Sequence, residues 1–326
     1  MSTMIQKVLK EIEQHDKFLI TTHVKPDGDA IGSLLATAEV LEQAGKNVEL
    51  YCQDTLIHWQ NTLPGAHRID NQIQSPLETF DAAVILDCGD LSRIGEYQGG
   101  IATIPILINI DHHLTEKPFT ELRLGNTSAS STSELLFDLF DTWNIRWTPS
   151  IATNLYVGIF TDTGSFRFSN TTKRCFEMAS FLVKSGANPA EIAQNIYGQC
   201  HINRLKLLCL VLNTLELVCD GKLSHITASQ EMFAKTDTSA RDTEDFINFP
   251  RSLRGIKIAI FFREEKNGLI NVSLRSLGEV NVARLVGEFG GGGHRNAAAC
   301  RFSNSSLDNV KREIIKAGCN YLMKYE

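Results

Sequence analysis

Short apolar runs alternate with longer segments of helical periodicity along the first half of the chain. The runs predict strands at residues 18–22, 47–52, 80–86 and 104–110, and the periodic segments predict helices at 30–45 and 151–160. Strands that are apolar on both faces are typical of a parallel sheet, because helices cover both faces of such a sheet. The pattern therefore predicts an α/β fold with a parallel-sheet N-terminal domain.

A second pattern begins near residue 215, after helices predicted at 174–184 and 204–217. Strands are predicted at 215–219, 223–228, 256–263 and 269–276, and the Asn267-Gly268 pair between the last two is a strong hairpin signal. We therefore expect a domain at 1–187, a helical linker at 188–214, and a smaller mixed α/β domain at 215–326.

Polar side chains are concentrated where the first predicted strand meets the first predicted helix. His23, Asp27 and Asp29 lie there, in a loop that Pro26 and Gly28 allow to turn sharply. Two carboxylates and an imidazole this close repel or titrate one another unless a cation lies among them, which indicates a metal site. The alternative is an ordinary loop in which Asp29 caps the helix and Asp27 is solvated.

Further acids and histidines follow later apolar elements. Because ligands of parallel sheets gather beyond the carboxyl ends of the strands, such residues favour coordination, although Asp87 alone could equally be a turn or helix-cap residue. The residues in these places are Asp87, Asp111, His112, His113 and Asp162.

Composition narrows the class of protein and its partners. The 326 residues carry a net charge of −6, which argues against a protein that binds long duplex nucleic acid through a general basic surface. No run reaches the ~18 apolar residues of a membrane span, and the N-terminus lacks the apolar centre of a signal peptide. The eight cysteines form no C-x-x-C pair, so neither a zinc site nor a disulfide framework is indicated. We expect a cytoplasmic protein with reduced thiols and no membrane partner.

The distinctive feature of the second domain is a run of four glycines followed by a histidine: Gly290, Gly291, Gly292, Gly293 and His294. Four glycines are costly in entropy unless the backbone must approach something closely, and their N–H groups can form an anion nest. A long helix C-cap followed by a flexible loop is the alternative. Lys and Arg outnumber Asp and Glu between residues 241 and 301, so arginines there are candidate phosphate contacts.

Four motifs resemble those of the DHH phosphoesterase family: HVKPDGD (23–29), ILDCGD (85–90), DHH (111–113) and FTDTGSF (160–166). The resemblance implies two divalent ions held side by side, with Asp87 as the bridge. The first would be bound by His23, Asp27 and Asp87, and the second by Asp29, Asp87, His112 and Asp162. It also implies that His113 faces the substrate phosphate and that Asp111 orients a histidine. Nitrogen and oxygen ligands without cysteine suggest Mn²⁺, with Co²⁺, Fe²⁺ or Mg²⁺ as alternatives.

Two adjacent cations would activate a shared water as the nucleophile and neutralise the phosphoryl oxygens. The glycine run resembles the signature of the DHH-associated C-terminal domain. This implies that Arg275, the glycines and His294 bind substrate across an active-site cleft between the domains, although ordinary sheet-face charge is the alternative for Arg275.

The two-domain chain most resembles the NrnA type of the family. This resemblance implies hydrolysis of short oligoribonucleotides to mononucleotides and removal of the 3′-phosphate from 3′-phosphoadenosine 5′-phosphate. Whether the protein forms a homodimer is left open by the sequence. One alternative is a family II inorganic pyrophosphatase, whose C-terminal Ser-Arg-Lys-Lys-Gln signature is missing here. Another is a non-catalytic nucleotide sensor, which predicts the loss of at least one metal ligand, whereas all six are present.

Overall fold

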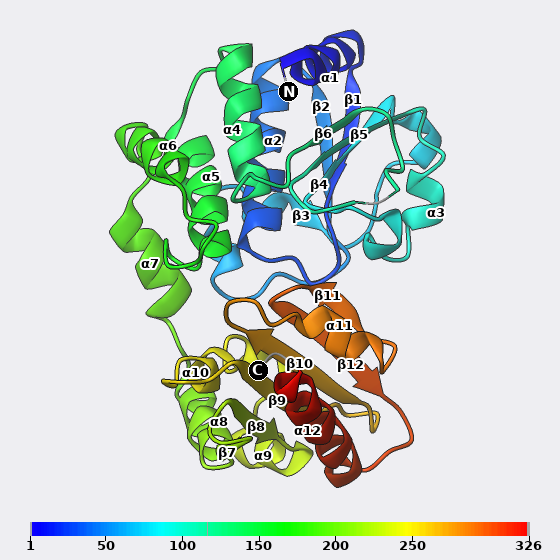
Figure 1. The fold of residues 1–326 in the computed structure, drawn as a ribbon. Coiled ribbons are helices and arrows are strands. Elements are labelled where there is room, and N and C mark those ends of the chain that lie inside the picture. Colours follow the sequence, from blue (N-terminus) through cyan, green and yellow to red (C-terminus); the bar gives the residue numbers. More distant parts are fainter. Residues whose placement is uncertain (1, 116, 325–326) are drawn as a thin grey trace. The chain divides into compact units, whose positions relative to one another are not determined.

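The computed structural model describes residues 2–115 and 117–324, and Figure 1 shows its helices and strands. The chain forms two compact units, Met1–Gln199 and Cys200–Glu326. The division falls inside the predicted linker, because α7 (Pro189–Tyr197) lies in the first unit and α8 (Ile202–Leu212) in the second. Among the described residues, no helix is both long enough and apolar enough to cross a membrane.

The first unit is built on a six-stranded sheet in the order β3-β2-β1-β4-β5-β6, and all its neighbouring strands are parallel. The central strand β4 is buried along its whole length, as its apolar run predicts. The strands are β1 (Lys17–Thr21), β2 (Asn47–Tyr51), β3 (Ile69–Asp70), β4 (Ala82–Leu86), β5 (Ile106–Asp111) and β6 (Arg123–Gly125). The predicted α/β fold with a parallel sheet is confirmed.

Helices and short turns cover both faces of this sheet. Figure 1 shows α2, α4 and α5 beside one another on one side and α3 on the other. The larger hydrophobic core lies under α1 (Ser2–Gln14), α2 (Gly28–Gln43), α4 (Thr132–Trp143), α5 (Pro149–Asp162) and α6 (Lys173–Lys184). The smaller core, on the opposite face, is closed by α3 (Gln98–Ile101) and the 3₁₀ turn Leu91–Arg93.

The strand order reverses between β1 and β4. From β1 the chain moves outward through β2 and β3, and then it returns to β4 and moves the other way through β5 and β6. In an open α/β sheet, ligands bind beyond the carboxyl ends of the strands at such a switch point. His23 follows β1, Asp87 follows β4, and Asp111 ends β5, so the topology brings these residues to one place.

The second unit contains a mixed sheet in the order β11-β12-β10-β9-β8-β7, in which β8 and β9 pair in parallel. Its strands are β7 (Glu216–Val218), β8 (Leu223–Ala228), β9 (Ile258–Glu264), β10 (Ile270–Ser276), β11 (Gly292–His294) and β12 (Ala297–Phe302). Its further helices are α9 (Gln230–Thr236), α10 (Asn248–Arg251), α11 (Val282–Gly287) and α12 (Leu307–Met323). Asn267 and Gly268 connect the antiparallel strands β9 and β10, which confirms the predicted hairpin.

One cysteine pair departs from the sequence-based expectation. Cys219, directly after β7, is bonded to Cys319 in α12, so the expectation of reduced thiols without a disulfide is wrong at this pair. The two residues are 100 positions apart, and only the folding of the second unit brings their Cα atoms to 5.7 Å. No local spacing motif could reveal a pair of this kind.

Candidate metal centre

The loop between β1 and α2 carries three predicted metal ligands. Asp27 is the N-cap of α2, because its Oδ1 accepts a hydrogen bond from Ala30 N at 3.0 Å. The alternative in which Asp29 caps this helix is therefore wrong. His23 Nδ1 lies 2.9 Å from the Val24 carbonyl oxygen, which can only accept, so Nδ1 carries the proton and Nε2 is available to a metal.

Asp29 is completely buried against the N-terminus of α4. Its carboxylate oxygens accept hydrogen bonds from Thr132 N at 2.6 Å and Ser133 N at 2.9 Å. The positive end of the helix dipole favours a negative charge at this point. Gly158 of α5 leaves the necessary room, since a Cβ there would lie 2.5 Å from Asp29 Oδ1. Two helices remote in sequence therefore fix this carboxylate.

Asp87 lies at the centre of the cluster. It follows β4 with a φ of 54°, a left-handed conformation that Asp and Asn adopt more readily than most residues other than glycine. Its Oδ2 is 3.5 Å from His23 Nε2, and its Oδ1 is 3.6 Å from His112 Nε2 and 3.5 Å from His113 Nδ1. Thr132 Oγ1 donates a hydrogen bond to Oδ1 at 2.9 Å. Asp87 therefore links the end of β1 to the end of β5.

Asp162 ends α5 and faces His112. The distance from Asp162 Oδ2 to His112 Nε2 is 3.2 Å, while His112 Nδ1 lies 3.3 Å from the Ala129 carbonyl oxygen. Asn170, which the sequence analysis misses, donates through Nδ2 to the carbonyl oxygens of Asp162 and Ser130, both at 3.1 Å. Asn170 therefore ties the end of α5 to the segment that precedes α4.

The carboxylate of Asp111 holds the imidazole of His113. The distance from His113 Nδ1 to Asp111 Oδ1 is 2.7 Å. Burial alone would lower the pKa of His113, but the hydrogen bond to Asp111 and the charges of Asp87 and Asp111 outweigh burial and raise this pKa. The arrangement therefore favours the protonated imidazole, which can donate to a phosphate oxygen.

The crowding of carboxylates is the main electrostatic feature of the site. Burial raises the pKa values of Asp29, Asp87 and Asp162, and neighbouring carboxylates, including Asp27, raise them further. Ionised acids this close stabilise the fold only when a cation compensates their repulsion. Because imidazole nitrogens and carboxylate oxygens are ligands of divalent cations, the donor set fits such an ion.

Three groups of side chains are each compact enough to hold a metal ion. Within each group, the ligand atoms lie within 4.8 Å of one another. The groups are His23, Asp27 and Asp87; Asp29, His112 and Asp162; and Asp87, His112 and His113. All six residues predicted as ligands occur in these groups. The protein therefore has acidic and histidine clusters that can bind metal.

Arg123 of β6 is a further residue that sequence reasoning does not identify. Its Nη2 donates to Asp111 Oδ2 at 3.3 Å, to the His113 carbonyl oxygen at 2.8 Å and to Thr115 Oγ1 at 3.1 Å. Its Nε donates to Asn109 Oδ1 at 3.1 Å. The guanidinium thus fixes the main chain and the carboxylate that orient His113.

The variant Arg123→Lys is expected to lower kcat/KM of the phosphoester hydrolysis that the family resemblance implies by about 10-fold or more, because a point charge cannot make these bonds together. Mn²⁺ affinity measured by titration calorimetry should also fall. Arg146→Lys, at an exposed position in the same unit, serves as the matched control. Unchanged kinetics and unchanged Mn²⁺ affinity in Arg123→Lys would contradict the positioning role.

The glycine run of the second unit is only partly a loop. Gly290 has a φ of 70° just after α11, and Gly292–His294 forms the edge strand β11. A Cβ on Gly291 or on Gly293 would lie 2.5 Å from a carbonyl oxygen of β12. The helix-cap half of the alternative is confirmed, because Gly291 N donates to the Val286 carbonyl oxygen at 2.9 Å, but a strand and not a loop follows at Gly292–His294. The close approach that Gly291 and Gly293 permit is to the neighbouring strand. The outer side of β11 is an edge of the sheet, where main-chain groups can meet a ligand.

Three arginines of the second unit differ in their surroundings: two pair with acidic side chains, and the third, Arg275, is half-buried in the sheet. Arg263 bonds to Glu265 at 2.8 Å, and Arg295 bonds to Glu279, so these two guanidinium groups have acidic partners. Arg275 of β10 is half-buried. Burial and the nearby Arg251 lower the pKa of Arg275, and the charge of Asp245 opposes this effect.

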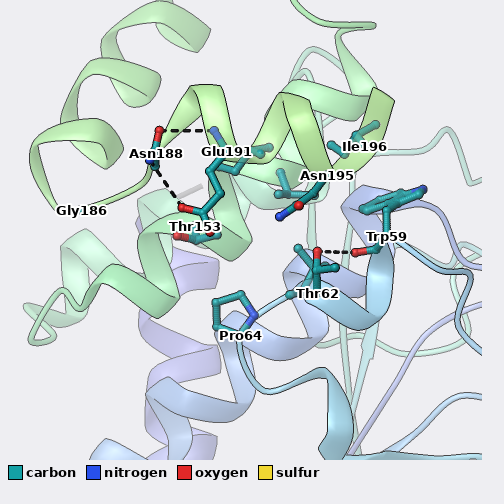
Figure 2. A pocket seen from close by; sticks show the side chains of 12 residues that line it. Trp59, Thr62, Pro64, Thr153, Gly186, Asn188, Glu191, Asn195 and Ile196 are labelled. Carbon is teal, nitrogen blue, oxygen red and sulfur yellow. Dashed lines mark hydrogen bonds between the residues drawn. The ribbon is translucent and has the colours of Figure 1, made fainter. Parts of the chain in front are cut away.

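A separate cavity of about 120 Å³ lies in the first unit, between α5, α7 and the loop that carries Trp59 (Figure 2). Apolar side chains such as Val157 and Ile192 line it together with Asn188 and Glu191, whose side chains lie 3.4 Å apart. The described lining includes none of the predicted site residues. The acid and histidine chemistry therefore lies at the switch point of the sheet and not in this cavity.

Comparison with known proteins agrees with this geometry. Residues 17–159 match the N-terminal domain of the DHH family, and residues 226–322 match the DHHA1 domain. A protein from Thermus thermophilus named bifunctional oligoribonuclease and PAP phosphatase NrnA is 32% identical over 314 residues, which is 96% of this chain and 92% of that protein. The protein of the same name from Bacillus subtilis is 28% identical over 321 residues, 95% of this chain and 97% of that one.

Solved structures share the architecture. An exopolyphosphatase-related protein from Bacteroides fragilis has a TM-score of 0.91 and 30% identity, with coverage of 100% of this chain and 97% of that one. RecJ from Thermus thermophilus, solved in complex with Mn²⁺, shares the fold alone, with a TM-score of 0.51, 13% identity and coverage of 97% of this chain and 54% of RecJ. The two domain matches and the near full-length relatives show that the chain belongs to the DHH family of metal-dependent phosphoesterases.

Proposed function

We propose that this protein is a Mn²⁺-dependent phosphoesterase that hydrolyses short oligoribonucleotides to mononucleotides and removes the 3′-phosphate from 3′-phosphoadenosine 5′-phosphate. The observation that carries the proposal is the meeting of Asp29, Asp87 and Asp162 with His23 and His112 at the switch point of the sheet. The names of the Thermus and Bacillus relatives support the two substrate classes. A cytoplasmic location stays a prediction, and so does the state of assembly.

We assign two divalent ions to these donors. His23, Asp27 and Asp87 would hold one ion, and Asp29, Asp87, His112 and Asp162 would hold the other. Bound there, such ions would supply an activated water and neutralise charge on the phosphoryl group. The protein's own contribution is to fix each imidazole through its Nδ1 atom, so that Nε2 of His23 and of His112 faces the carboxylates.

His113 and the second unit would bind the substrate. Protonated His113, oriented by Asp111, would donate a hydrogen bond to a phosphate oxygen of the substrate. In the second unit we assign substrate contacts to Arg275, to His294 and to the main chain of Gly290, Gly291, Gly292 and Gly293. The exposed edge of β11 and the partly buried charge of Arg275 support this assignment. The net charge of −6 supports short substrates over long duplex nucleic acid.

The two alternatives are less well supported. The relatives named above carry oligoribonuclease and phosphatase names, which favours the proposal over an inorganic pyrophosphatase. A nucleotide sensor predicts a missing ligand, whereas each of the six predicted ligands lies in a compact group.

A substrate panel tests the proposal. The purified protein with Mn²⁺ should convert di-, tri- and pentanucleotide RNAs to mononucleotides and 3′-phosphoadenosine 5′-phosphate to AMP, with little action on pyrophosphate. Parallel reactions with Co²⁺, Fe²⁺ and Mg²⁺ identify the preferred metal. Preferential hydrolysis of pyrophosphate would replace the proposal with the first alternative, and nucleotide binding without hydrolysis under any of these metals would replace it with the second.

A further inference from the structure

The segment after Asp162 presents an aromatic side chain beside the metal centre. Phe168 is 38% exposed, although a phenylalanine with a purely structural role is usually buried. Its ring lies against Gly164, since a Cβ on that glycine would lie 2.5 Å from the ring atoms Cε1 and Cε2. Gly164 is two residues from Asp162, and two residues of chain span at most about 7 Å. The ring is therefore close to a predicted metal ligand.

The backbone between Asp162 and Phe168 is strained and firmly held. Gly164, Ser165 and Phe166 have φ values of 57°, 62° and 61°, an unfavourable region for a bulky side chain such as Phe166. The Thr163 carbonyl oxygen accepts a hydrogen bond from Phe168 N at 2.9 Å, and Thr163 Oγ1 accepts one from Phe166 N at 3.1 Å. Such strain persists only where surrounding contacts enforce it, and it is concentrated at functional sites. The turn thus places Phe168 in a defined position at the end of α5.

The neighbouring aromatic residues have a packing role. Phe166 stacks on Phe176 with ring centroids 5.3 Å apart and contacts Phe160 at 5.8 Å. Tyr197 contacts Phe160 at 6.0 Å and bonds to Ser165 Oγ through its hydroxyl group at 2.7 Å. These rings pack on one another. The Phe168 ring lies against Gly164, the second residue after Asp162.

We propose that Phe168 forms a nucleobase-stacking subsite, on which the base of a nucleotide stacks when its phosphate lies at the metal centre. The inference rests on the proposed function and adds to it the way in which the first unit recognises a base. An aromatic ring stacks on any base, because every base has a π-face, and such contacts are typical of sequence-tolerant single-strand binding. The subsite therefore binds nucleotides of any sequence and disfavours phosphoesters that lack a base.

Kinetics of Phe168 variants test the subsite. Phe168→Ala should raise KM for dinucleotide RNA by about 10-fold with little change in kcat, and Phe168→Trp should retain the KM of the parent protein. For an abasic dinucleotide with the same backbone, Phe168→Ala should leave kcat/KM unchanged. Phe176→Ala is the matched control, because Phe176 is 56% exposed on the adjacent helix α6 and should leave KM unchanged.

Fluorescence supplies a readout that needs no turnover. A dinucleotide that contains 2-aminopurine and a non-hydrolysable methylenephosphonate linkage should lose emission on binding to the parent protein with Mn²⁺, and Phe168→Ala should restore the emission. If the parent protein hydrolyses dinucleotides while Phe168→Ala changes neither KM nor quenching, the stacking subsite is refuted and the proposed function stands. If the parent protein hydrolyses no nucleotide, the proposed function fails. An equal rise in KM in Phe176→Ala would assign the effect to local packing and overturn the inference.

Discussion

Replacing Asp87 by asparagine is expected to lower kcat for dinucleotide hydrolysis by about three orders of magnitude, with loss of the thermal stabilisation that Mn²⁺ gives. The reason is its central position, since its carboxylate lies within 3.6 Å of His23, His112 and His113. Asparagine tests the role of the charge more directly than alanine does, because it keeps the side-chain volume and tolerates the φ of 54° at this position. The amide removes the charge without leaving a cavity.

The same variant separates loss of function from loss of fold. Burial and the charges of Asp29 and Asp27 raise the pKa of Asp87, so its ionised form destabilises the metal-free protein. Metal-free Asp87→Asn should therefore melt at or above the temperature of the metal-free parent protein at pH 7.5. Asp90→Asn, at an exposed position three residues further on, should keep full activity. Retained activity in Asp87→Asn would contradict the central role, and a lower melting temperature would show that its charge is compensated without metal.

Local sequence patterns predict the main strands of the first unit, because the apolar runs that mark a buried strand are formed by neighbouring residues. Apolar runs locate β1, β4 and β5, since buried parallel strands need apolar residues on both faces. The polar residues that end these runs then mark one edge of the sheet. This reasoning places His23, Asp87 and Asp111 without knowledge of any contact.

The features of the site that the sequence does not predict depend on contacts between distant segments. The amides of Thr132 and Ser133 reach Asp29 across more than one hundred residues, and Gly158 is required only because α5 packs closely beside that carboxylate. Arg123 and Asn170 likewise act through folded geometry, because neither residue lies in a spacing motif. The glycine run also has a role that its sequence does not reveal, since two of its glycines permit close packing against β12 within the chain itself.

Without metal, the protein is expected to lose stability as pH rises above 3.8, the usual pKa of an aspartic acid. Asp29, Asp87 and Asp162 have pKa values above their usual 3.8 in the folded state, so over this range the native protein binds more protons than the unfolded chain does. The slope of the unfolding free energy against pH is then negative. His113 acts in the same direction, because its raised pKa gives stability that is lost as pH passes through the folded value. The lowered pKa of Asp111 acts at lower pH and leaves this window unaffected.

Mn²⁺ should reverse this slope, because the cation favours the ionised carboxylates that destabilise the metal-free fold. The melting temperature of chelator-treated protein should fall with rising pH, and the increase in melting temperature on adding Mn²⁺ should grow in the same direction. Calorimetric titrations in buffers of different ionisation enthalpy should show protons released on binding, with fewer released as pH rises. Asp87→Asn should flatten the metal-free slope, since it removes one of the groups responsible. A metal-free stability that rises with pH, together with a Mn²⁺ effect independent of pH, would mean that the three carboxylates are already compensated by the protein and that their crowding does not drive metal binding.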